Sequence, residues 1–139
     1  MYIEKINQPT DVKNLNSEQL HILADEMRQA LLQKLSKHGG HFGPNLGMVE
    51  ATIALHYVFN SPTDKIVYDV SHQSYPHKML TGRRDRFHTI RKRGGLGPFT
   101  DPNESIHDQF ISGHAGSALS VSAGLAAANP DKNVAVVIG

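Results

Sequence analysis

The chain has 139 residues, 39% of them hydrophobic, which is enough to bury the core of one domain of ordinary size. Its formal charge of +1 at pH 7 offers no bulk attraction to nucleic acid or to an anionic membrane, and no apolar run approaches the ~18 residues that span a bilayer. The absence of cysteine excludes disulfides and thiolate metal sites, and the first residues do not form a signal peptide, so we expect a cytoplasmic protein. Nine histidines are the unusual feature, because histidine titrates near neutral pH.

Two amphipathic helices are predicted in the first half of the chain. Leucine and methionine recur at steps of three and four residues from Ser17 until Gly39 ends the first helix. A second helix is expected to begin at Pro44 or Asn45 and to end before Asn60. Its inward face is expected to consist of Val49, Ile53, Ala54, Val58 and Phe59.

The second half of the chain alternates strands with helices. The pattern predicts, in order, a strand at 66–70, short helices at 75–81 and 85–92, a loop at 94–103, a helix at 117–128 and a buried strand at 134–138. A strand followed by helices and a second strand is a right-handed crossover, so the sheet should be parallel and the fold α/β.

His41 lies in a turn with four glycines, residues 39–47, between the first two helices. Glycine lets the backbone approach a ligand closely, and a rigid loop would present the imidazole of His41 to it. The turn is equally consistent with a tight connection that leaves His41 merely exposed, because glycine is the usual residue after a helix. It indicates a ligand contact only together with the next two segments.

Residues 71–73 follow the predicted strand 66–70 at its carboxyl end, where open α/β sheets bind their ligands. His72 is therefore a candidate to bind a substrate or cofactor oxygen and to move a proton near pH 7. His77 is expected to be a packed or capping side chain. A zinc site made of His72 and His77 is disfavoured, because two ligands on one helix are expected four residues apart and no third ligand is near.

The segment Gly113-His114-Ala115-Gly116-Ser117 opens the helix predicted at 117–128. The free amides and the dipole of a helix amino end form a natural anion site. Small residues are also consistent with close packing of the helix against a sheet, so both interpretations stay open.

A basic run lies at residues 83–93 and consists of Arg83, Arg84, Arg86, Arg91, Lys92 and Arg93. It could bind phosphate, but Asp85 interrupts it and no aromatic ladder accompanies it. A solvated helix face is the expectation.

Three longer stretches carry a more specific pattern. They are the turn at 39–41 with Leu46-Gly-Met-Val-Glu50, the segment Ala54-Leu-His-Tyr-Val-Phe59 and, above all, Asp69-Val-Ser-His-Gln-Ser-Tyr-Pro-His-Lys-Met-Leu-Thr-Gly-Arg83. The match continues through Glu104, Ser105, Asp108, Phe110, Gly113 and His114. With these motifs the chain resembles the 1-deoxy-D-xylulose-5-phosphate synthase family, thiamine-diphosphate enzymes of the transketolase superfamily.

The resemblance implies a three-layer α/β fold with a doubly wound, mostly parallel sheet. Residues 1–139 would be the N-terminal part of the domain that binds the cofactor's diphosphate. It also implies thiamine diphosphate and Mg²⁺ as cofactors, pyruvate and glyceraldehyde 3-phosphate as substrates, and a homodimer. Pyruvate would lose carbon dioxide and join the aldehyde to give 1-deoxy-D-xylulose 5-phosphate, a step towards isoprenoids.

The same resemblance assigns roles to individual residues. His41 and His72 would be catalytic, with His41 facing the thiazolium and the acceptor aldehyde. His72 and the segment Gly113-His114-Ala115 would contact the cofactor. The family's magnesium loop is Gly-Asp-Gly with an asparagine further on, and its first glycine matches Gly139. We therefore expect the magnesium ligands after Gly139, and no turnover by this chain alone.

Two places differ from the family pattern. Pro44 and Asn45 stand in the glycine turn, and Ala115 and Gly116 replace residues that are usually hydroxylated. A transketolase-like paralogue with another acceptor therefore stays open as an alternative, and so does a non-catalytic binding module with the same fold.

Overall fold

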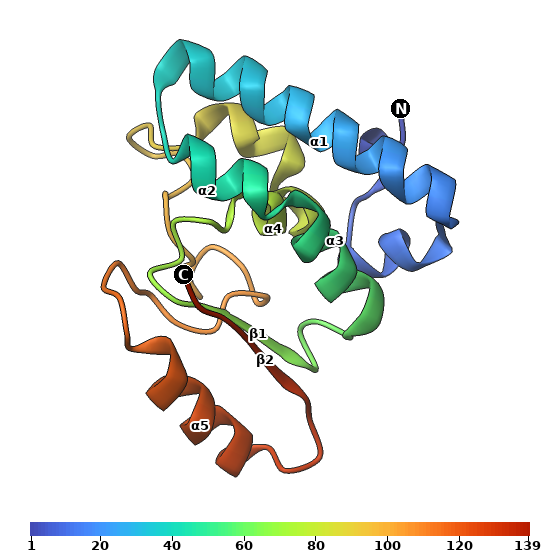
Figure 1. The fold of residues 1–139 in the computed structure, drawn as a ribbon. Coiled ribbons are helices and arrows are strands. Elements are labelled where there is room, and N and C mark those ends of the chain that lie inside the picture. Colours follow the sequence, from blue (N-terminus) through green and yellow to red (C-terminus); the bar gives the residue numbers. More distant parts are fainter.

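The computed structural model describes residues 1–139 (Figure 1). Its helices and strands are α1 (Ser17–His38), α2 (Phe42–Gly47), α3 (Val49–Val58), β1 (Lys65–Tyr68), α4 (Tyr75–Lys78), α5 (Ala118–Ala128) and β2 (Val134–Val137). Short 3₁₀ segments occupy Ile3–Lys5, Pro9–Asn14 and Arg84–Thr89, and a π turn occupies Met79–Arg83. No helix of the structure combines the length and the apolar character needed to cross a bilayer.

Helix α1 follows the predicted pattern. The side chain of Asn16 accepts a hydrogen bond from the amide of Gln19 at 2.9 Å, and the Gln19 side chain accepts one from the amide of Asn16 at 2.9 Å. This capping box satisfies two amides at the helix start, and Gly39 ends the helix with φ of +69°. Leucines, Ala24 and Met27 bury one face of α1 in the main apolar core.

The second predicted helix is divided in two. Helix α2 begins at Phe42, earlier than expected, and Pro44 is tolerated there because it lies in the first turn, where helix amides need no partner within the helix. Met48 has ψ of 1°, which interrupts the helix before α3 starts.

The predicted inward face of α3 is only partly correct. Val49 and Ile53 are buried, but Ala54 is exposed and Val58 is 65% exposed. The inward face instead includes two polar side chains, Thr52 and His56. Ala54 and Val58 lie on the side of α3 that borders two apolar surface pockets, one against α1 and one against the end of β2.

The two strands pair in parallel, with Lys65 opposite Val134 and Tyr68 opposite Val137, as the crossover predicts. The α/β class is thereby confirmed. Figure 1 shows α5 on one side of the strand pair and helices α1 to α4 on the other. The doubly wound, three-layer arrangement needs more strands than these two and stays a prediction.

A network of buried polar side chains is centred on Asp108. Asp108 accepts two hydrogen bonds from Arg83, at 2.7 and 2.8 Å, and its Oδ1 lies 3.0 Å from Nε2 of His77. The other nitrogen of His77 lies 2.9 Å from Nε2 of His56. These four side chains belong to α3, α4, the π turn and the loop before α5, and all are buried. The packed role expected for His77 is confirmed.

The expectation that the basic run forms a solvated helix face is wrong for Arg83. Its guanidinium is not on a solvated face, because it is 4% exposed and also binds Glu104 at 2.9 Å. A charge run in sequence does not reveal that acidic partners 21 and 25 residues later fold back onto one member. The remaining members stay at least partly exposed, namely Arg84, Arg86, Arg91, Lys92 and Arg93.

We predict that acidification from about pH 6.5 to about pH 4 lowers the free energy of unfolding. Burial is the main cause that lowers the pKa of His56, His77 and His107, that of His107 to about 4. The unfolded chain, whose histidines titrate near about 6.5, therefore binds more protons in this range. Above the histidine pKa of the unfolded chain, these buried neutral histidines contribute fully to stability. Their contribution is lost as the pH falls from that pKa towards the lower pKa values of the folded state.

Urea unfolding at about pH 7.5 and about pH 5 measures this loss. His107→Gln should reduce the pH dependence, whereas His21→Asn, on the exposed side of α1, should leave it unchanged. A midpoint that does not move between the two pH values would contradict the prediction.

Candidate functional site

The chain turns sharply where β1 ends. Val70 and Ser71 have φ of 58° and 68°, a left-handed conformation that costs a β-branched residue energy. Three hydrogen bonds hold the turn: the Ser71 hydroxyl accepts from the amide of Thr100 at 3.0 Å, Ser74 donates to the carbonyl of Ser71 at 2.6 Å, and Gln73 donates to the carbonyl of Asp69 at 3.0 Å. A strained turn held this firmly fixes the direction of the residues after it.

His72 follows that turn and lines a cavity of about 270 Å³. The cavity also borders Gln73, the α2 residues Pro44 and Met48, and the end of β2 at residues 137–139. Its position confirms that the carboxyl ends of both parallel strands meet at one edge. Nδ1 of His72 and Oε1 of Gln73 are buried without a hydrogen-bond partner. Since buried polar atoms are nearly always paired, two orphans beside a cavity suit a polar ligand.

His41 lies next to His72. It is the residue before α2, and its ring stands edge-on to the ring of His72 with centroids 5.5 Å apart. Nδ1 of His41 lies 3.3 Å from the hydroxyl of Tyr75. Burial, together with the nearby His72 and Arg91, lowers the pKa of His41 below its ordinary value. The imidazole is therefore neutral at pH 7 and can accept a proton.

Asn45 joins the two histidine loops, a role that the sequence did not reveal. Its side chain is fully buried and contacts the backbone of residues 41, 72 and 75. The only signal in the sequence was its departure from the family pattern.

The segment before α5 differs from the expectation of free amides. The amides of Gly116 and Ala118 donate to the carboxylate of Asp69, at 2.9 and 3.2 Å. The amino end of α5 is thus capped by an anion of the chain itself, and this contact lowers the pKa of Asp69. These two amides are therefore not free for an external anion, while the cofactor contacts of Gly113, His114 and Ala115 stay a prediction.

The predicted contact residues of this segment lie at its exposed start. Gly113 is packed against the ring of Phe99, whose centroid is 5.8 Å from that of His41. His114 and Ala115 are exposed, and the backbone hydrogen bonds of His114 stay within the segment, to Ser112 and Ser117. The structure therefore brings Gly113 to the histidine pair through Phe99, another residue that the sequence did not single out.

No group of three or more histidine, aspartate or glutamate side chains is arranged to hold a metal ion. His77 does not approach His72 as a second ligand, because its nitrogens face His56 and Asp108 instead.

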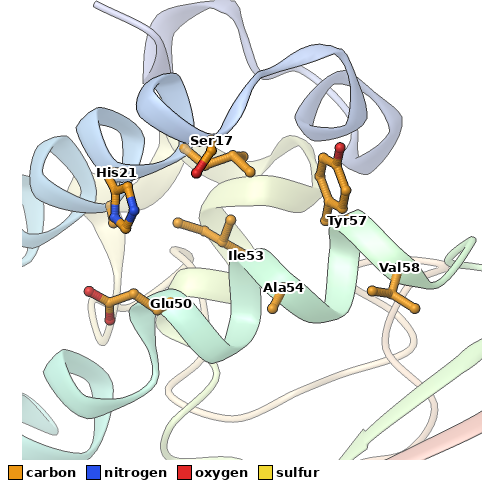
Figure 2. Close-up of a pocket in the computed structure, with 9 residues that line it drawn as sticks. Ser17, His21, Glu50, Ile53, Ala54, Tyr57 and Val58 are labelled. Carbon is orange, nitrogen blue, oxygen red and sulfur yellow. The ribbon is translucent and has the colours of Figure 1, made fainter.

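A separate cavity of about 270 Å³ lies between α1 and α3, away from the histidine loops (Figure 2). Figure 2 shows Ile53 and Ala54 in its lining, with His21, Glu50 and Tyr57 around them. Its lining is mainly hydrophobic, and it includes none of the buried unpaired side-chain atoms. It therefore lacks the polar features that mark the site beside His72.

The structure is that of an α/β protein with a cavity and two buried unpaired polar atoms where its two parallel strands end. A family model described as 1-deoxy-D-xylulose-5-phosphate synthase matches residues 3–139. The chain belongs to this family.

Curated relatives support the same assignment. A 1-deoxy-D-xylulose-5-phosphate synthase of Thermomicrobium roseum is 57% identical over 129 residues, which is 92% of this chain and 20% of the relative. Proteins of the same name from Chlamydia felis and Caldanaerobacter subterraneus are 51% and 52% identical, over 97% and 99% of this chain and 21% and 23% of their own length. The chain spans about a fifth of the length of the curated relatives it matches.

We predict that Asp69→Ala destabilises α5 selectively. Without the carboxylate, the amides of Gly116 and Ala118 lose their acceptor, and the start of α5 should open more often. Hydrogen–deuterium exchange followed by mass spectrometry should show faster exchange in residues 113–121 and unchanged exchange in α1.

Asp131→Ala is the matched control, since Asp131 is exposed and follows α5. Equal protection of residues 113–121 in Asp69→Ala and in the control would show that the cap is dispensable.

Proposed function

We propose that the complete protein is a thiamine-diphosphate-dependent transferase of the transketolase type. It would condense pyruvate, with loss of carbon dioxide, with glyceraldehyde 3-phosphate to form 1-deoxy-D-xylulose 5-phosphate. Membership of the family supports this reaction. The observation that carries it in the structure is the buried, unpaired Nδ1 of His72, a residue that lines a cavity at the carboxyl ends of β1 and β2 and stands next to His41.

The proposal also covers the domains and the oligomeric state of the complete protein. Residues 1–139 would be the N-terminal part of a diphosphate-binding domain with a doubly wound, three-layer fold. The remaining four fifths of the relatives' length leaves room for the pyrimidine-binding and third domains of the family. The complete protein would be a cytoplasmic homodimer that uses Mg²⁺.

The residues at the end of β1 fit a polar cofactor because they include buried polar atoms without a partner. His72 offers a buried nitrogen without a partner, and Gln73 offers a buried oxygen. His72, Gly113, His114 and Ala115 would hold the cofactor, while Asp69 keeps the amides of Gly116 and Ala118 occupied. When bound, thiamine diphosphate supplies the electron sink that allows pyruvate to lose carbon dioxide.

His41 would serve the substrates. Its Nδ1 is engaged by the Tyr75 hydroxyl, which leaves Nε2 as the nitrogen that can exchange a proton with the acceptor aldehyde oxygen. Its lowered pKa keeps the ring neutral at pH 7. In the tautomer in which Nδ1 accepts from the Tyr75 hydroxyl, Nε2 carries the hydrogen and would donate it to the aldehyde oxygen as that oxygen gains negative charge. His72, held by the strained turn, would orient the ligand through Nδ1.

We predict that His72→Ala in the complete protein lowers catalytic efficiency with pyruvate at least tenfold. A hydrogen bond from His72 to a charged ligand is worth about 1.5–3 kcal/mol, and about 1.4 kcal/mol corresponds to a factor of ten. Steady-state kinetics with pyruvate and glyceraldehyde 3-phosphate measure the loss, after circular dichroism shows that the variant is folded.

His21→Ala is the matched control, because this histidine is exposed on α1 and lines only the cavity of Figure 2. Its kinetics should equal those of the parent. A folded His72→Ala variant with parental turnover would show that the site has been placed wrongly.

We also predict that residues 1–139 alone bind thiamine diphosphate with Mg²⁺ weakly or not at all. The family's magnesium ligands are expected after Gly139, and the cofactor's pyrimidine would lack its own domain. Titration calorimetry on the isolated chain tests this, and binding in the micromolar range would refute it.

A further inference from the structure

The side chain of Asn45 is fully buried, and all its hydrogen bonds go to backbone atoms. Nδ2 donates to the carbonyl of His41 at 2.6 Å and to the carbonyl of His72 at 2.8 Å. Oδ1 accepts from the amide of Tyr75 at 2.8 Å. Both N–H groups of the amide are therefore used, and one bond goes to each candidate catalytic histidine.

These bonds connect two segments that are far apart in the sequence. One carbonyl belongs to the glycine turn before α2, and the other belongs to the strained turn after β1. The other hydrogen-bonding contact between these loops is longer, 3.3 Å between the hydroxyl of Tyr75 and Nδ1 of His41. A single planar amide thus fixes the spacing of the two backbone segments from which the histidine rings project.

We infer that Asn45 is a positioning residue, which holds the His41 and His72 imidazoles at their edge-on separation of 5.5 Å. It acts through the backbone, since its buried amide is fully engaged there. The catalytic consequence rests on the proposed function, whereas the positioning itself does not.

The amide of Asn45 supplies both the donors and the acceptor that these contacts use. Aspartate has the same shape and could still accept from Tyr75, but it would place a carboxylate oxygen against two carbonyl oxygens. Alanine offers neither a donor for the two carbonyls nor an acceptor for the amide of Tyr75. Either change should let the two loops move apart.

The test uses the complete protein with Asn45→Ala, and Asn45→Asp as a second variant should the first fail to fold. Asn133→Ser is the control, because Asn133 also joins two segments, through Asp64, but at the opposite ends of β1 and β2. Circular dichroism and melting temperature establish folding. The main readout is the deuterium exchange of individual imidazole C2 hydrogens by mass spectrometry, which reports the pKa and accessibility of each histidine and needs no activity.

We expect exchange at His41 and His72 to change in the Asn45 variants and to remain parental in Asn133→Ser. The pKa of His41 should rise towards its ordinary value as the ring becomes less buried and moves away from His72; the other groups that face it are Tyr75 and Arg91. In the catalytic assay, kcat should fall about tenfold or more with little change in KM, because a displacement of about 1 Å can cost a hundredfold in rate.

Unchanged exchange at both histidines in a folded Asn45 variant would overturn the inference, whatever the kinetics. A parent protein that does not convert pyruvate and glyceraldehyde 3-phosphate would instead refute the proposed function, and the exchange measurement would still decide the role of Asn45. Changed exchange with parental kcat would limit Asn45 to a structural role and reject its effect on catalysis.

Discussion

The carboxylate of Asp69 makes the contact on which the arrangement of the site depends. It lies at the end of β1 and accepts hydrogen bonds from the amides of Gly116 and Ala118, 47 and 49 residues later. The strand pair and the start of α5 are thereby fixed to each other. The turn that follows takes two left-handed residues to bring His72 to the edge where β2 also ends. The strain there persists because hydrogen bonds from Gln73, Ser74 and Thr100 hold the turn.

The buried network around Asp108 also stabilises the loop next to the site. Asp108 also accepts from the amide of Asp101 at 2.8 Å, one residue after Thr100, which donates to Ser71. The loop that carries Phe99 is therefore attached both to the network and to the turn before His72. Removing one partner of such a buried charge cluster leaves the others unpaired, which destabilises a protein strongly. We interpret the network as the rigid support of the loop between the histidines and α5.

Much of this organisation could be predicted from the sequence, because it depends on local patterns. The periodicity of α1, the apolar runs of the two strands and their parallel pairing were correct. The placement of His72 after the carboxyl end of β1 also followed, whereas His41 lies between two helices and its proximity to His72 did not follow from a local pattern.

The remaining features depend on partners distant in sequence. Nothing local indicates that Asp69 caps α5, that Arg83 turns inward to Asp108, or that Asn45 bridges two loops. The exposed side of α3 was misassigned for a related reason: an apolar residue such as Val58 has the same pattern whether it faces the core or a surface groove.

The central claim is that a polar cofactor binds where β1 and β2 end, through the unpaired nitrogen of His72. A crystal structure of the complete protein with thiamine diphosphate and Mg²⁺ tests this most directly. The account predicts the cofactor in the cavity beside Gln73 and the end of β2, with Nδ1 of His72 about 2.7–3.2 Å from a cofactor atom. A cofactor bound elsewhere, or a His72 Nδ1 paired with another protein group, would contradict it.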